Sequence, residues 1–229
     1  MKLVIKIGGS LLFDQNHNFK LSQFANYAQV IRQLVNQNHN IILVIGGGIL
    51  AKTLVERGKA LGANRDAQDN LGIAATRVCA QLMITALNDI TYPTPITSEE
   101  ELMHLQDNGR LLVLGGLQPG QSTNAVAARV AELTNSEILI NLTDVDGVYD
   151  KDPKESPDAK LLHELSLNQL GKIVASLASD PGTYPLFDKR ALGIVERAKV
   201  EIWFINGTDA ENLLHAVKEG KIGTRITTE

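Results

Sequence analysis

Five short runs of apolar residues recur along the chain, and longer segments with helical periodicity separate them. The runs contain few polar side chains, which is typical of strands buried on both faces of a parallel sheet. They cover residues 3–7, 41–45, 111–114, 138–142 and 202–205. Strands that alternate with helices predict an α/β fold in three layers, an α/β/α sandwich with an open, mainly parallel sheet.

The helical segments are longer and amphipathic, with apolar residues at every third or fourth position. They cover residues 20–37, 49–61, 67–88, 123–134, 187–198 and 209–219. Two further helix starts are marked by capping boxes, in which a serine and a side chain three residues later each bond the other's backbone N–H. These boxes pair Ser98 with Glu101 and Ser166 with Gln169.

Residues 144–158 form the most turn-rich stretch, with glycine, two prolines and several charged side chains. Glycine, proline and aspartate favour turns over regular elements. The sequence has no internal repeat and no long linker. We therefore expect one domain, residues 1–229, in which this stretch separates a lobe of about 1–142 from a lobe of about 143–229.

Composition excludes several classes of protein. The chain has 229 residues, 44% hydrophobic and 21% charged, which is ordinary for a globular domain with a full core. Its net charge of -4 argues against a nucleic acid or an anionic membrane as partner. No uninterrupted apolar run approaches the roughly 20 residues that span a bilayer. The single cysteine, Cys79, lies in a helical apolar pattern, which predicts core packing and a reducing, cytoplasmic compartment.

Glycine-rich segments follow four of the five predicted strands. They read IKIGGS, LVIGGGILAK, VLGGLQPGQST and LTDVDGVYDKDP. Ligands of open α/β sheets bind beyond the carboxyl ends of the strands, so these segments are expected to meet at one edge. Glycines let backbone N–H groups approach a phosphate, and a following helix adds its dipole. With Lys6 two residues before the first glycine, the pattern predicts an anion site.

Two standard phosphate motifs nearly match after the second run. Residues 46–51 fit the dinucleotide pattern G-x-G-x-x-A, but the acidic residue at the end of the next strand is missing. Residues 46–53 resemble a P-loop in which Ala51 replaces the second glycine, so Lys52 is expected to point outward from a first helical turn. Neither motif holds, although phosphate binding remains the prediction.

Taken together, these segments resemble the amino acid kinase family and, within it, the archaeal-type uridylate kinases. The most specific parts are GGLQPGQSTNAVAARVAE at 115–132, TDVDGVYDKDPK at 143–154 and GTYPLFDKRALGIVERAKV at 182–200. The likeness covers essentially the whole chain. It implies the amino acid kinase fold and transfer of the γ-phosphoryl group of ATP to UMP, giving UDP in pyrimidine nucleotide biosynthesis.

The resemblance also implies roles for single residues. Lys6 would stabilise charge on the transferred phosphoryl group, and Asp188 would face the reaction centre as the second catalytic residue. Besides Lys6, the residues expected to bind ATP are Gly8, Gly9, Ser10, Gly48, Lys52, Thr143, Asp144, Tyr149 and Asp152. Those expected to bind UMP are Gly47, Asp69, Leu117, Gln118, Pro119, Gly120, Gln121, Ser122 and Thr123. The first lobe would therefore hold the acceptor and the second the ATP.

Cofactor and assembly follow from the same resemblance. Mg²⁺ is expected with ATP, because its phosphates need a counter-ion, while no metal-ligand spacing links the five histidines. Uridylate kinases typically form hexamers built as trimers of dimers. The pattern at 69–87 carries apolar residues on more than one face, which favours pairing with a second copy. Its burial under residues 91–109 is the alternative.

Three positions depart from the uridylate kinase pattern. Asn124 replaces a frequent acid, Asp144 a common asparagine, and Gly193 a frequent lysine. They leave open a kinase of the same superfamily that acts on another small phosphate or alcohol. A nucleotide-binding protein without turnover is a second alternative, and a dinucleotide-dependent oxidoreductase, which rests on the G-x-G-x-x-A match alone, is a third.

Overall fold

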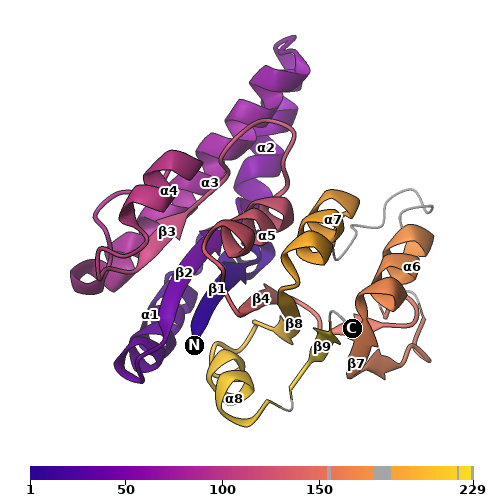
Figure 1. Cartoon of the computed structure of the whole chain (residues 1–229). Helices are drawn as coiled ribbons and strands as arrows, with labels where there is room; N and C mark the ends of the chain where they lie inside the picture. The colour runs from indigo at the N-terminus through magenta and orange to yellow at the C-terminus, as the bar shows by residue number, and fades with distance from the viewer. Residues whose placement is uncertain (154–155, 178–186, 221, 228–229) are drawn as a thin grey trace.

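The structure is a computed structural model of the chain and describes residues 1–153, 156–177, 187–220 and 222–227 (Figure 1). Within these residues the main sheet has the strand order β3-β2-β1-β4-β8-β9-β7. The five predicted runs form parallel neighbours, which confirms them to within one residue at either end. They are β1 (Lys2–Ile7), β2 (Asn40–Ile45), β3 (Leu112–Leu114), β4 (Ile138–Thr143) and β8 (Glu201–Asn206).

Two strands at one end of the sheet were missed by the sequence patterns. β9 (Thr224–Thr227) pairs antiparallel with β8, and β7 (Glu164–Ser166) pairs parallel with β9. A separate two-stranded ladder joins β5 (Val148–Tyr149) to β6 (Leu161–Leu162). These strands are two to four residues long, so none of them carries enough residues to show an alternating pattern.

Helices cover both faces of the sheet, as predicted for the three-layer sandwich. One face packs under α1 (Leu21–Asn36), α3 (Arg65–Leu87) and α8 (Glu211–Glu219). The other packs under α4 (Glu99–Leu105), α5 (Thr123–Leu133), α6 (Leu167–Leu177) and α7 (Lys189–Ala198). Strand β1 shows the division, because Leu3, Ile5 and Ile7 face the first layer whereas Val4 faces the second. By the same alternation Lys6 points to the face that carries α5.

The predicted capping boxes start two of these helices. Ser98 Oγ accepts from Glu101 N at 3.1 Å at the start of α4. At the start of α6, Ser166 Oγ accepts from Gln169 N at 3.3 Å, and Gln169 Oε1 accepts from Ser166 N at 2.8 Å. The second pair is therefore a reciprocal box, which fixes where the chain leaves β7 and enters α6.

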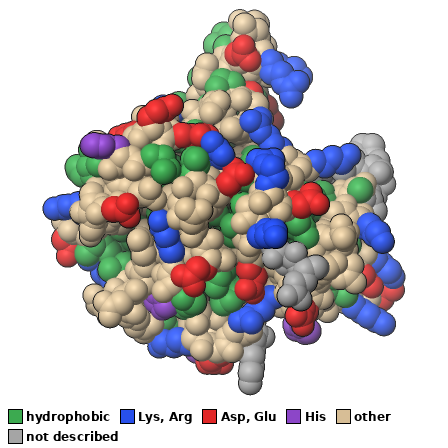
Figure 2. Space-filling view, viewed as in Figure 1, with side chains coloured by type: hydrophobic (Ala, Val, Ile, Leu, Met, Phe, Trp, Pro, Cys, Tyr) green, Lys and Arg blue, Asp and Glu red, His purple; other side chains and the backbone are tan. Residues whose placement is uncertain are grey.

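The long helix α3 is both a core helix and part of a projection. With α2 (Gly48–Ala60) it forms a hairpin that projects from the body (Figures 1 and 2). Cys79 on α3 is fully buried, which confirms its core packing.

By length and composition alone, the helical stretch Arg65–Ile90 is the one stretch in the described part of the chain that passes as a membrane span, with mean hydropathy 1.3. It packs on α1, α2, β2 and β3, and the core helix of a folded protein passes the same test. That no membrane is involved stays a prediction.

Candidate nucleotide site

A cleft of about 820 Å³ lies where the parallel strands end, within the usual range for small-molecule sites. All four glycine-rich segments contribute to its walls, which confirms that they meet at one edge of the sheet. The predicted site residues that line it are Lys6, Gly8, Gly9, Ser10, Gly47, Gly48, Lys52, Asp69, Gln118, Gln121, Ser122, Thr123, Thr143, Asp144, Tyr149 and Asp152.

Four predicted site residues do not line the cleft directly. Leu117 is 8% exposed and packs in the core under α5. Pro119 and Gly120 are exposed at the tip of their loop. Asp188 caps the N-terminus of α7, close enough to Lys6 to influence its charge. The side chain of Leu117 therefore supports the loop from beneath, and any contact of that residue with an acceptor is left to its backbone.

The first two glycine loops contact each other through their backbones. A Cβ built on Gly9 would lie 2.0 Å from Gly48 N, and one built on Gly46 would lie 2.6 Å from Gly9 N. Gly48 also has φ +53°, a conformation that L side chains rarely adopt. Only glycine permits this approach. It brings the loop after β1 against the first turn of α2, whose N–H groups face the cleft.

Lys6 is the cation at the floor of this cleft. It is partly exposed to the cleft, and desolvation lowers its pKa from about 10.5 to about 8, while Asp144 and Asp188 oppose this shift. Asp144 follows β4 and Asp188 begins α7, so three separate parts of the chain supply the cluster. An ammonium held beside two carboxylates at a glycine-rich edge is suited to stabilise negative charge on a phosphoryl group.

Two helix N-termini are joined next to Lys6. Ser122 Oγ accepts from Ala125 N at 3.0 Å and caps α5, while Asp188 Oδ1 accepts from Arg190 N and Ala191 N at 3.0 Å and caps α7. Ser122 Oγ also donates to Asp188 Oδ2. The helix α5 therefore begins at the cleft, and the N-terminus of α7, with the positive end of its dipole, is bonded directly to that start.

The third glycine segment is fixed by side chains of α3. Thr76 Oγ1 accepts from Gly116 N at 2.6 Å, and a Cβ on Gly115 would lie 2.5 Å from that oxygen. Asp69 Oδ2 accepts from Gly120 N at 2.7 Å. One carboxylate oxygen of Asp69 thus orders the loop, and within the described residues no hydrogen bond is found to the other.

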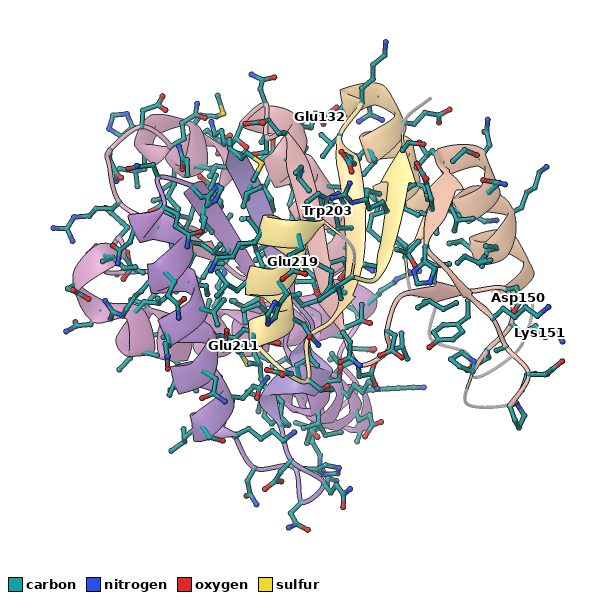
Figure 3. The ribbon with its side chains drawn as sticks, turned by 90° about the horizontal axis from the view of Figure 1, so that it is seen from below. Glu132, Asp150, Lys151, Trp203, Glu211 and Glu219 are labelled. Carbon is teal, nitrogen blue, oxygen red and sulfur yellow. The ribbon has the colours of Figure 1, made fainter. Side chains whose placement is uncertain are left out.

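Sequence reasoning missed Asn206, which does not line the cleft itself but supports a segment that does. Its Nδ2 donates to Asp146 Oδ1 at 2.7 Å, and Tyr149 OH donates to Asp146 Oδ2 at 3.1 Å. Asp146 therefore ties the fourth glycine segment to the end of β8. An Asn-Gly pair after a buried strand was the only sequence signal. Asp150 and Lys151, at the edge of the molecule in Figure 3, follow in the same segment, and Lys151 also lines the cleft.

The wall formed by α6 was also missed. Leu170, Ile173 and Val174 line the cleft beside Val148 and Tyr149. This apolar patch suits the flat face of a nucleobase, in line with the mostly apolar lining of small-molecule sites. At the other end of the cleft, Gln121 Oε1 is buried and accepts no hydrogen bond within the described residues. A ligand donor would relieve its desolvation cost, about 1–3 kcal/mol.

The described residues contain no group of three or more histidine, cysteine, aspartate or glutamate side chains placed to hold a metal ion. A metal that relied on protein ligands alone therefore finds no cage in this part of the chain. An ion that arrives with phosphate oxygens needs fewer protein ligands, because Mg²⁺ is often held by one or two carboxylates together with substrate phosphates.

Comparison with known proteins identifies the family. A model of the amino acid kinase family matches residues 1–206. The chain belongs to the amino acid kinase family. The uridylate kinase of Methanobrevibacter smithii is 35% identical over 229 residues, covering all of both chains. That of Hyperthermus butylicus is 39% identical over 225 residues, 98% of this chain and 97% of that one.

A solved structure of the same family agrees in fold. The uridylate kinase from Archaeoglobus fulgidus superposes with a TM-score of 0.87 at 36% identity, and the match covers 99% of this chain and 100% of that one. The predicted family and the predicted α/β/α architecture are thus confirmed. The roles of single residues stay predictions, which the geometry above makes testable.

The pKa of Lys6 leads to a prediction about stability. Because this pKa is about 8 in the folded chain and about 10.5 in the unfolded chain, the unfolded state binds more protons between these values. The contribution of Lys6 to the free energy of unfolding therefore rises with pH in this window and is least favourable below it. We expect Lys6→Met to be more stable than the wild type at pH 7, with the difference shrinking from pH 8 to pH 10 in urea denaturation. A difference independent of pH would contradict the desolvation of Lys6.

Proposed function

We propose that this amino acid kinase transfers the γ-phosphoryl group of ATP to UMP and releases UDP and ADP, a step of pyrimidine nucleotide biosynthesis in the cytoplasm. The observation that carries the proposal is that Lys6 lines a cleft walled by four glycine-rich segments, with Asp144 and Asp188 near enough to stabilise its charge. The relatives described above, named uridylate kinases and similar over their full length, support UMP as the acceptor.

The cleft divides into two halves around Lys6. Gly47, Asp69 and the loop 117–123 would hold UMP, with the second carboxylate oxygen of Asp69 accepting from the ribose hydroxyls. The other half would hold ATP. Its phosphates would lie along Gly8–Ser10, Gly48 and Lys52, and its base against the apolar wall of α6. Besides Lys6, the residues proposed to bind ATP all line the cleft. They are Gly8, Gly9, Ser10, Gly48, Lys52, Thr143, Asp144, Tyr149 and Asp152.

Transfer in this arrangement is direct. An oxygen of the UMP phosphate attacks the γ-phosphorus, the bond from that phosphorus to the β,γ-bridging oxygen breaks, and ADP leaves with the electron pair. Such reactions depend on alignment and charge stabilisation more than on covalent catalysis. Lys6, charged at neutral pH, would stabilise the three oxygens of the phosphoryl group in flight, and Asp188 would position Lys6.

Mg²⁺ is the cofactor that this reaction implies. Asp144 and Thr143 offer hard oxygen donors at the ATP half of the cleft, which fits a metal held by one carboxylate and by phosphate oxygens. When bound, the ion would neutralise charge on the β- and γ-phosphates. Asp144 would then have two partners, the metal and Lys6.

An ADP-release assay over a panel of acceptors tests the function. We expect UMP to give a higher kcat/KM than CMP, dUMP or small alcohols, and a product with the mass of UDP. Turnover with a small alcohol but not with UMP would support another kinase of the family.

Lys6→Ala should lower kcat by about two to four orders of magnitude, the scale for loss of one preorganised charge stabiliser. Unchanged turnover in Lys6→Ala would remove Lys6 from catalysis.

Asp69→Asn tests the assignment of the acceptor half. The amide keeps the shape and one acceptor oxygen but loses the charge, which is worth about 1.5–3 kcal/mol in hydrogen bonds to ribose hydroxyls. The KM for UMP should rise by about one to two orders of magnitude, while the KM for ATP changes little. Asp66→Asn, one turn earlier on α3 and exposed, is the matched control and should change neither. A rise confined to ATP would mean that the two halves are exchanged.

We also propose that α3 pairs with its copy in a hexamer built from dimers. Val78 is 49% exposed on a face of α3 that includes Ala74, Gln81 and Thr85. The side chains of this face are small or weakly polar, and they are exposed, whereas other residues of the same helix are buried in the core. This face can therefore approach a second copy across a two-fold axis.

Val78→Glu should break this assembly, because each copy would bury an unpaired carboxylate at the two-fold contact. Light scattering at micromolar concentration should find six chains for the wild type and fewer for the variant. Leu21→Glu, which places the same charge at a leucine 69% exposed at the start of α1, should keep six. A monomeric wild type would remove the assembly proposal.

A further inference from the structure

Charged side chains from two helices anchor the loop that would hold the acceptor, residues 117–123. From α3, Asp69 Oδ2 accepts from Gly120 N at 2.7 Å. From α7, Arg190 Nη1 donates to Gly120 O at 2.9 Å. Both backbone polar groups of one residue are therefore bonded by opposite charges, one on each side of the loop. A backbone amide held at both ends has its orientation defined.

The tip of this loop has little other support. Residues 118–120 are exposed, and Gly120 has φ +75°. Within the described residues, the backbone hydrogen bonds of residues 117–120 go to Asp69, Arg190 and Arg77, whose Nη2 donates to Leu117 O at 3.4 Å. Residues 117–120 lie in neither a strand nor a helix themselves, so their position depends on these side chains.

Arg190 lies on a different helix from the other two side chains that bond this loop. Asp69 and Arg77 belong to α3, whereas Arg190 follows the N-cap of α7 by two residues. That N-cap, Asp188, also accepts from Ser122 at the end of the same loop. The first turn of α7 therefore holds the acceptor loop at two points, and the same turn places the Asp188 carboxylate next to Lys6.

We propose that Arg190 is a positioning residue for the acceptor, which fixes the loop 117–123 against the first turn of α7. The side chain is exposed and does not line the cleft, so it acts through Gly120 and not by contact with the substrate. If Arg190 has this role, the first turn of α7 determines both the position of the acceptor loop and the position of the Asp188 carboxylate near Lys6. This inference rests on the proposed function in taking UMP as the acceptor.

Arg190→Leu is the variant that tests this role. It keeps an apolar stem on an exposed position and removes the donor to Gly120 O. We expect the KM for UMP to rise by about three- to tenfold, less than for a buried charged bond because the contact is open to solvent. The KM for ATP should stay within about twofold. Arg190→Lys, which keeps the charge but loses the planar guanidinium, should recover part of the loss.

Hydrogen exchange gives a readout that does not depend on turnover. In the ligand-free protein, the peptide over residues 115–124 should exchange several-fold faster in Arg190→Leu, because a freed loop opens more often. Arg197→Leu is the matched control. Arg197 lies on the same helix and donates to Glu132 Oε1 at 3.2 Å. Within the described residues it has no hydrogen bond to the loop. Glu132 lies on α5, which packs next to α7 (Figure 3). Arg197→Leu should change neither the KM for UMP nor the exchange.

The outcomes separate this inference from the proposed function. If the wild type phosphorylates UMP but Arg190→Leu leaves both the KM for UMP and the loop exchange unchanged, the inference fails and the function remains. Equal effects of Arg190→Leu and Arg197→Leu, or equal rises in both KM values, would also overturn it. If the wild type does not act on UMP, the proposed function fails, and the exchange of residues 115–124 still decides whether Arg190 positions the loop.

Discussion

The backbone contact between Gly9 and Gly48 is the constraint on which the site depends. Strands β1 and β2 are parallel neighbours, so their loops leave the sheet side by side. A single Cβ on Gly9 would meet backbone atoms at 2.0–2.9 Å, and backbone cannot move aside as a side chain can. Because the loops touch, α2 begins directly over the end of β1. Its first N–H groups and the Lys6 ammonium then face the same space, which is a ready anion site.

The charge on Lys6 is an example of how the proposed function and the stability of the fold would oppose each other. Desolvation lowers its pKa, and Asp144 and Asp188 restore only part of the stability of the charged form. A cation that is poorly solvated is better able to interact with a phosphoryl group, because water does not compete for it. The same desolvation of the Lys6 ammonium lowers the free energy of unfolding. Such a conflict between stability and activity is common at catalytic sites.

The N-terminus of α7 connects the two halves of the cleft. Asp188 caps this helix, bonds the cap of α5 and faces Lys6, and Arg190 reaches the acceptor loop. Helix N-caps usually stabilise only their own helix. In this chain two caps bond to each other, so the first turn of α7 connects the loop 117–123, which is proposed to bind the acceptor, to the surroundings of Lys6, the proposed catalytic cation. On the side of the cleft proposed for ATP, Asp146 has a similar role, because it links Tyr149 to the end of β8.

The sequence alone determined the features that depend on neighbours along the chain. Apolar runs and helical periodicity located the strands and most helices, capping boxes located the starts of α4 and α6, and glycines after the strands located the edge at which Lys6 and Asp69 lie. Tertiary structure decided what depends on residues far apart in the chain. The short strand β9 forms against β8 and β7 forms against β9, and Arg190 meets Gly120 across 70 positions. No local pattern encodes such contacts, because a hydrogen bond between distant residues leaves no periodicity and exists only once the layers have packed.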